Sequence, residues 1–74
     1  MRAHDELVGI FTSEGREVEV YLCWVGDRPE DDDNAFFDFY ENGVCINLGN
    51  PWFADKSLDL PSEADFWECH KNRV

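Results

Sequence analysis

Apolar and polar residues alternate with a period of two along much of the first half of the chain. The alternation is clearest over residues 17–25, Glu-Val-Glu-Val-Tyr-Leu-Cys-Trp-Val, and it predicts a strand with one buried face. Residues 6–12 form another apolar run, and Glu14-Gly15 between the two segments is a plausible two-residue turn. The pattern therefore predicts an N-terminal β-hairpin.

A second hairpin is predicted after an acidic loop. Residues 26–34 contain a proline and a run of carboxylates, and neither suits the interior of a strand. The ring-rich residues 35–41 predict a third strand, and residues 44–48 predict a fourth that returns beside it. Asn42-Gly43 joins them, because both residues tolerate the positive φ of a type I′ turn. Residues 50–53 are expected to leave the sheet as a loop.

Hairpin geometry also predicts which side chains share a face of the sheet. Three cross-strand pairs of the first hairpin are expected on the buried face, beside Trp24: Phe11 with Val18, Gly9 with Val20 and Leu7 with Leu22. Two pairs of the second hairpin are expected there as well: Phe39 with Ile46 and Phe37 with Leu48. The pairs expected on the outer face are Asp38 with Asn47 and Tyr40 with Cys45.

A short helix is predicted near the C-terminal end. Ser62 is a suitable N-cap for residues 63–71, and Asp65 three residues later makes a weaker form of the capping box. The expected apolar stripe is Ala64, Phe66 and Trp67, with Cys69 or His70 at its margin. The fold class is therefore α+β. Residues 1–74 form a single domain, a four-stranded antiparallel meander of two hairpins with the helix packed on one face.

The outer face carries apolar side chains as well as polar ones. Those expected on it are Val8, Ile10, Tyr21, Phe36 and Tyr40. A cluster of exposed apolar groups on a small protein is a candidate contact surface. Two alternatives remain open at this point. Trp52 and Phe53 either cover part of this face, or join Tyr21 and Tyr40 as an apolar contact for a partner or for a second copy in a homodimer.

Charge narrows the possible partners. The chain has 17 Asp and Glu against 6 Lys and Arg, a net charge of -11. A small domain needs a net charge of only about 2 to 8 for solubility, so the surplus calls for another explanation. Proteins that bind nucleic acids or anionic membranes directly carry the opposite sign. The expected partner is therefore a basic, nucleic-acid-binding protein, with no direct nucleic-acid contact and no membrane.

The candidate binding residues are the carboxylates of the second strand and of the acidic loop. Glu17 and Glu19 point the same way about 6.6 Å apart, two steps of a strand rising about 3.3 Å per residue. Two phosphate steps of duplex DNA span about 6.8 Å, so carboxylates at this spacing can imitate the backbone charge. The other candidates are Asp27, Glu30, Asp31, Asp32, Asp33, Asp38 and Glu41. The alternative is that these acids only solvate a loop and an open face.

Catalytic and metal-binding patterns are weak, so we expect no enzyme, no cofactor and no metal. Cys69 and His70 are adjacent, and helical neighbours diverge by about 100°. A zinc site would need Cys23 and Cys45 to converge with that pair, without the usual paired spacing. Counting from Asp31, an EF-hand would place glycine and glutamate where Phe36 and Asn42 stand. Three widely spaced cysteines and the lack of a signal-like start predict a cytoplasmic protein.

In its size, its acid-rich stretches and its lack of catalytic motifs, the chain resembles small inhibitors carried by phages and mobile elements. These include anti-CRISPR and anti-restriction proteins that mimic DNA. The resemblance implies blockade of a basic nucleic-acid-binding surface on a defence protein, in the host cytosol if the chain is phage-encoded. It also implies fast, salt-dependent association. The alternatives are an immunity or antitoxin-like protein that neutralises a basic nuclease, and a homodimeric interaction domain.

Overall fold

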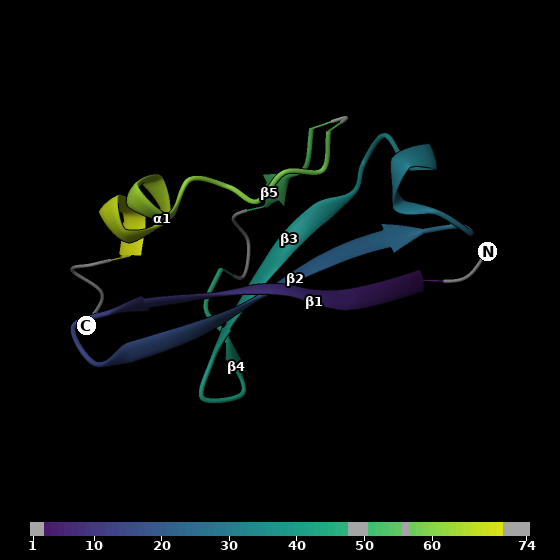
Figure 1. Cartoon of the computed structure of the whole chain (residues 1–74). Coiled ribbons are helices and arrows are strands. Elements are labelled where there is room, and N and C mark those ends of the chain that lie inside the picture. Colours follow the sequence, from purple (N-terminus) through teal and green to yellow (C-terminus); the bar gives the residue numbers. More distant parts are fainter. Residues whose placement is uncertain (1–2, 48–50, 56, 71–74) are drawn as a thin grey trace.

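Five antiparallel strands, one α-helix and a short 3-10 helix make up the described fold (Figure 1). The computed structural model describes residues 3–47, 51–55 and 57–70. The strands are β1 (Ala3–Ser13), β2 (Arg16–Val25), β3 (Phe36–Glu41), β4 (Val44–Cys45) and β5 (Trp52–Phe53), and the helix is α1 (Glu63–His70). The sheet order is β1-β2-β3-β4, with β5 also paired to β3. The α+β prediction is confirmed, with one strand more than expected.

Both predicted hairpin turns are present, and their backbone explains why. Glu14 and Gly15 have φ values of 52° and 81°, and Asn42 and Gly43 have 54° and 80°. Positive φ at both central residues is the signature of a type I′ turn, whose twist matches that of the flanking strands. These turns connect β1 to β2 and β3 to β4, as the sequence predicts.

A bulge in β1 overturns part of the predicted register. Phe11 pairs with Val18 and Gly9 with Val20 as expected, but the register shifts between Leu7 and Gly9. Leu7 therefore pairs with Tyr21, and its predicted pairing with Leu22 is wrong. One extra residue in a strand reverses the facing of everything beyond it. Val8 consequently packs against the core instead of lying on the outer face.

The fourth strand is shorter than predicted because Asn47 turns inward. β4 ends at Cys45, and Asn47 is buried, so its expected outward position opposite Asp38 is wrong. The Asn47 side chain accepts a hydrogen bond from the Phe39 amide (3.1 Å) and donates one to the Phe37 carbonyl (3.2 Å). A side-chain amide thus replaces strand backbone along this edge of β3. Leu48, the predicted partner of Phe37, lies outside the described residues.

The loop predicted over residues 50–53 is wrong in its second half. Trp52 and Phe53 form β5, which pairs with Phe37 and Phe36 of β3. Because facing alternates along a strand, Trp52 points to the core side and Phe53 to the other. The Trp52 ring lies 5.2 Å from that of Phe39, so Trp52 does not cover the outer face.

The core lies between the sheet and α1, centred on Phe66. This ring is fully buried and lies 5.3 Å from the ring of Phe11 and 4.5 Å from that of Phe39. His70, one helical turn later, is also buried, whereas Ala64 is exposed, so the predicted stripe is wrong at that position. Ser62 caps the helix as predicted, because its Oγ accepts a hydrogen bond from the Asp65 amide. In the described part of the chain, no helix is long and apolar enough to cross a membrane.

Candidate functional site

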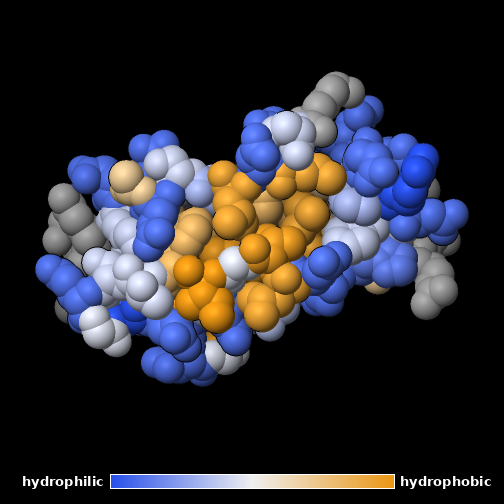
Figure 2. All heavy atoms as spheres, viewed as in Figure 1, coloured by the Kyte–Doolittle hydropathy of each residue, from blue (hydrophilic) through white to orange (hydrophobic). Residues whose placement is uncertain are grey.

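The helix covers only one face of the sheet, and the opposite face is the candidate contact surface. We call it the open face. The strand register places these described residues on it: Asp5, Leu7, Ile10, Thr12, Glu17, Glu19, Tyr21, Cys23, Phe36, Asp38, Tyr40, Cys45 and Phe53. Leu7, Ile10 and Phe53 are 46%, 49% and 64% exposed. Figure 2 looks onto the β1 edge of the sheet and shows an apolar area that extends from the middle of β1 toward the segment between β5 and α1, so this area is not confined to the open face.

Tyrosines and carboxylates alternate at the centre of the open face. Tyr21 lies opposite Asp38, and Glu19 lies opposite Tyr40. The two tyrosine rings meet edge to face, with 5.5 Å between centroids and 81° between planes. Beside them is a depression of about 430 Å³, lined by Asp5, Glu19, Tyr21, Tyr40 and Gly43. Residues of β2 and β3 thus form one surface that is both aromatic and acidic.

The thiol and phenol beside Asp38 are held in their neutral forms. Cys23 Sγ donates a weak hydrogen bond to Asp38 Oδ2 at 3.7 Å. Burial, then the charge of Asp38, raises the pKa of Cys23 to about 12. Burial and the same carboxylate also raise the pKa of Tyr40. The charged groups of the open face are therefore carboxylates alone among the described residues, and Cys23 is a poor nucleophile at neutral pH.

The acidic loop is bonded to the end of β2. It contains a turn of 3-10 helix, η1 (Pro29–Asp31), that the sequence did not predict. Asp32 accepts hydrogen bonds from the amides of Val25 and Asn34, both at 2.9 Å. Arg28 lies 3.4 Å from Asp31 and 3.7 Å from Glu30. Several carboxylates of this loop are therefore engaged within it.

A second depression, of about 450 Å³, joins the acidic loop to a segment that sequence reasoning missed. It is lined by Pro29, Glu30, Asp32, Asp33, Ala54, Asp55 and Leu58. The Ser57 hydroxyl donates to Asp55 at 2.6 Å and, with nearby backbone amides, lowers the pKa of Asp55. The Asp-x-Ser spacing indicates a local turn. This spacing does not indicate that the turn lies beside residues 29–33.

The predicted binding residues do not form one patch. Glu17 and Glu19 share the open face near the hairpin end of β2, whereas the acidic loop follows Val25 at the other end. Glu17 and Val25 are eight residue steps apart along the strand, a length of about 26 Å. The molecule measures 37 × 22 × 20 Å, so the two acidic groups lie toward opposite ends of its long axis. Asp38 lies between them, on the open face.

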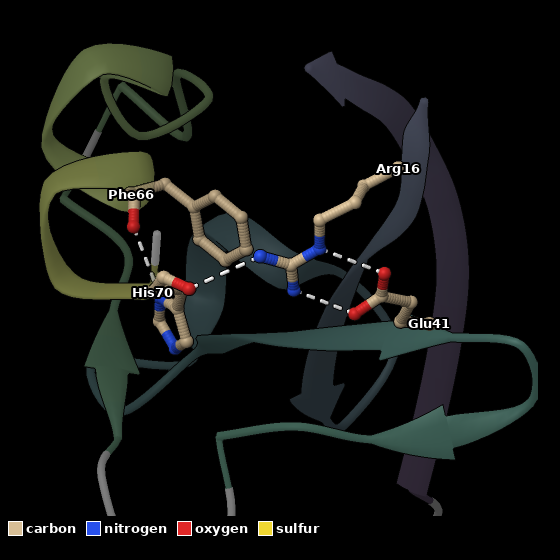
Figure 3. Close-up of polar contacts among 4 residues, drawn as sticks. All are labelled: Arg16, Glu41, Phe66 and His70. Carbon is tan, nitrogen blue, oxygen red and sulfur yellow. Dashed lines mark hydrogen bonds and ion pairs between the residues drawn. The ribbon is translucent and has the colours of Figure 1, made fainter. Parts of the chain in front are cut away.

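Glu41 faces the helix side and is committed to an ion pair within the fold. Arg16 donates two hydrogen bonds to its carboxylate, at 2.6 and 2.9 Å, and a third to the carbonyl of His70 (Figure 3). The Arg16 guanidinium also lies 5.0 Å from the centre of the Trp67 ring. Glu41 therefore holds α1 on the sheet through Arg16, and it is not an outward-facing carboxylate for a partner.

The weakly indicated catalytic and metal groups are not brought together. Cys69 is exposed, whereas His70 is buried with Nδ1 2.9 Å from the Phe66 carbonyl. Cys23 and Cys45 lie on the open face, away from both. Within residues 3–47, 51–55 and 57–70, no three His, Cys, Asp or Glu side chains cluster as metal ligands.

No family model, curated protein or solved structure matches this chain. Its function is therefore inferred from its own residues.

Proposed function

We propose that this chain is an acidic inhibitor that binds and blocks the basic nucleic-acid-binding surface of a defence protein, such as a CRISPR-Cas or restriction component. The observation that supports this most is the surplus of acidic over basic side chains in the described parts of the chain. All 17 acidic residues lie in the described parts of the chain. The described Lys and Arg residues there are Arg16 and Arg28, and both already contact carboxylates of the chain. A large negative surplus remains for an external cationic surface.

Inhibition would act by competition for that surface. A carboxylate-rich face attracts a cationic groove over several ångströms and speeds the encounter, and added salt weakens this attraction. Glu17 and Glu19 lie on the same face of one strand, so they can occupy two phosphate positions of the groove that are two steps apart. While the inhibitor is bound, nucleic acid cannot enter. The chain needs no catalytic group for this activity.

The test is a competition assay on purified defence proteins. Candidate CRISPR effectors and restriction endonucleases are mixed with labelled target DNA and increasing amounts of the chain. We expect one of them to release DNA, with an apparent affinity that falls steeply as salt rises. A natural partner that lacks a basic surface, or that still binds DNA with the chain attached, would contradict the proposal. If the partner is instead a toxic nuclease encoded beside this chain, the antitoxin alternative holds.

A further inference from the structure

We infer that the open face, and not the acidic loop, is the surface that docks on the basic partner, and that its depression receives an arginine side chain. This inference rests on the proposed function and names the contact it uses. It follows from the apolar exposure of the face, from the sign of its charges and from the shape around Tyr21 and Tyr40.

The open face combines exposed apolar groups on its outer strands with tyrosines and carboxylates at its centre. Leu7 and Ile10 stand on β1, Phe53 on β5, and each leaves about half or more of its surface to solvent. Tyr21 and Tyr40 lie between them, on the central strands. Contact surfaces are typically enriched in aromatic side chains at the centre and polar groups at the rim. Scattered exposed residues need no explanation, but a group on one sheet face indicates a contact.

The sign of the charges identifies the occupant. The ionised groups that the register places on this face are Asp5, Glu17, Glu19 and Asp38, and the described part of the face carries no Lys or Arg. Two copies of the chain meeting through this face would set those carboxylates against each other, which is unfavourable. A partner that presents apolar and cationic groups together matches both features. The occupant is therefore a basic protein surface and not a second copy.

The depression suits a guanidinium in particular. Tyr21 and Tyr40 offer two nearly perpendicular ring surfaces, and the acidic residues Asp5 and Glu19 line the same depression. A guanidinium stacks on aromatic rings and forms paired hydrogen bonds with a carboxylate, whereas an ammonium does so less well. Arginines of nucleic-acid-binding grooves are available once the nucleic acid is displaced. An arginine of the partner would thus anchor the open face.

The acidic loop is less suited to the same task. The Asp32 carboxylate accepts hydrogen bonds from two backbone amides, and Glu30 and Asp31 already lie beside Arg28. A partner would have to displace that internal cation to reach two of the loop's carboxylates.

A small probe tests the arginine site. N-acetyl-arginine amide is titrated into the protein while NMR shifts are followed, with N-acetyl-citrulline amide as the neutral control of nearly the same shape. We expect saturable shifts centred on Tyr21 and Tyr40 with arginine alone. Glu19→Gln should weaken binding several-fold, whereas Glu17→Gln, on the same strand but outside the depression, should not. Equal effects of the two substitutions, non-saturable shifts at all acids, or equal shifts with citrulline would overturn the arginine site.

A larger probe tests the face as a whole. The probe is an acetylated, amidated peptide of alternating arginine and leucine, measured by calorimetry. Leu7 and Leu60 are 46% and 44% exposed. Leu7 lies on the open face, whereas Leu60 contacts β1 at Gly9 from the helix side. Leu7→Ser should weaken binding and Leu60→Ser should not, with both variants folded by circular dichroism. Equal weakening, or a dimer of the wild type that Leu7→Ser abolishes, would overturn the inference.

These outcomes are distinguishable from a failure of the proposed function. If the probes bind the open face but no natural partner has a nucleic-acid-binding surface, the proposed function fails and the docking surface stands. If a defence protein is inhibited, and Leu7→Ser and Glu19→Gln inhibit it as well as the wild type does, the docking surface fails and the proposed function stands.

Discussion

Arg16 and Glu41, 25 positions apart, form a two-bonded ion pair that fastens the C-terminal helix to the sheet. The pair joins the first residue of β2 to the last residue of β3, and the remaining guanidinium nitrogen donates to the His70 carbonyl at 3.1 Å. The guanidinium thereby satisfies one of the carbonyls that a helix leaves unpaired in its last turn. One side chain connects three elements.

Replacing Arg16 should loosen the helix without changing the strands. Arg16→Ala removes three hydrogen bonds that are partly shielded from solvent, and we expect a loss of about 1–3 kcal/mol in unfolding free energy. Arg16→Lys should recover little of it, because an ammonium cannot form the same planar fork. Urea denaturation followed by tryptophan fluorescence measures the effect. Glu17→Gln is the control, and an equal loss in the control would contradict the role assigned to Arg16.

Replacing Asn47 by alanine should lower the free energy of unfolding by more than the small size of the side chain suggests. Asn47→Ala leaves the Phe39 amide and the Phe37 carbonyl without their partners inside the protein. Two buried polar groups left unsatisfied predict a loss of about 2–4 kcal/mol. Hydrogen exchange of the Phe39 amide should accelerate relative to the neighbouring strand amides. Unchanged protection at Phe39 would show that this bond does not hold the edge of β3.

Cys69 and Cys23 should differ in their rates of alkylation. Cys69 is exposed, whereas Cys23 is half-buried and has a pKa raised to about 12. Because the thiolate is the nucleophile, iodoacetamide at neutral pH should label Cys69 much faster than Cys23. Peptide mass mapping at successive times measures both rates. Labelling of Cys23 at the rate of Cys69 in the folded protein would contradict the environment described for Cys23.

The raised pKa of Cys23 also predicts a loss of stability in alkali. A thiol with a raised folded-state pKa favours the folded state while it stays protonated. This contribution is present below the ordinary pKa of 9.0 and is lost as the pH rises toward about 12. Cys23→Ser does not titrate in this range, so its unfolding free energy should fall less between pH 8 and about pH 10.5. If the unfolding free energies of the wild type and of Cys23→Ser fall equally over this pH range, the prediction is wrong.

Much of the fold follows from local sequence, and the exceptions have identifiable physical causes. The turns at Gly15 and Gly43 are predictable because few residue pairs tolerate positive φ twice. The β1 bulge is not, because Leu-Val-Gly-Ile-Phe is apolar throughout and does not say which side chains point inward. β5 has two residues, too few for a periodic signal. The inward turn of Asn47 depends on backbone groups of β3 that no local pattern reveals.

The candidate site was predictable only in part, for a related reason. Period two places Glu17 and Glu19 on one face, because that relationship lies within one strand. The ion pair that engages Glu41 and the approach of Asp55 to the acidic loop depend on contacts between distant segments. Composition reveals how much charge there is, but only the tertiary contacts show which carboxylates remain outward-facing.

The most direct test of the central claim compares two double charge reversals in the DNA-displacement assay. Glu17→Lys with Glu19→Lys changes the open face, and Asp27→Lys with Glu30→Lys makes the same change in net charge at the acidic loop. We expect the first pair to lose most of the inhibition and to flatten the salt dependence of what remains, while the second pair retains most of the inhibition. Equal losses from both pairs, or inhibition that survives the open-face reversal, would contradict docking through the open face.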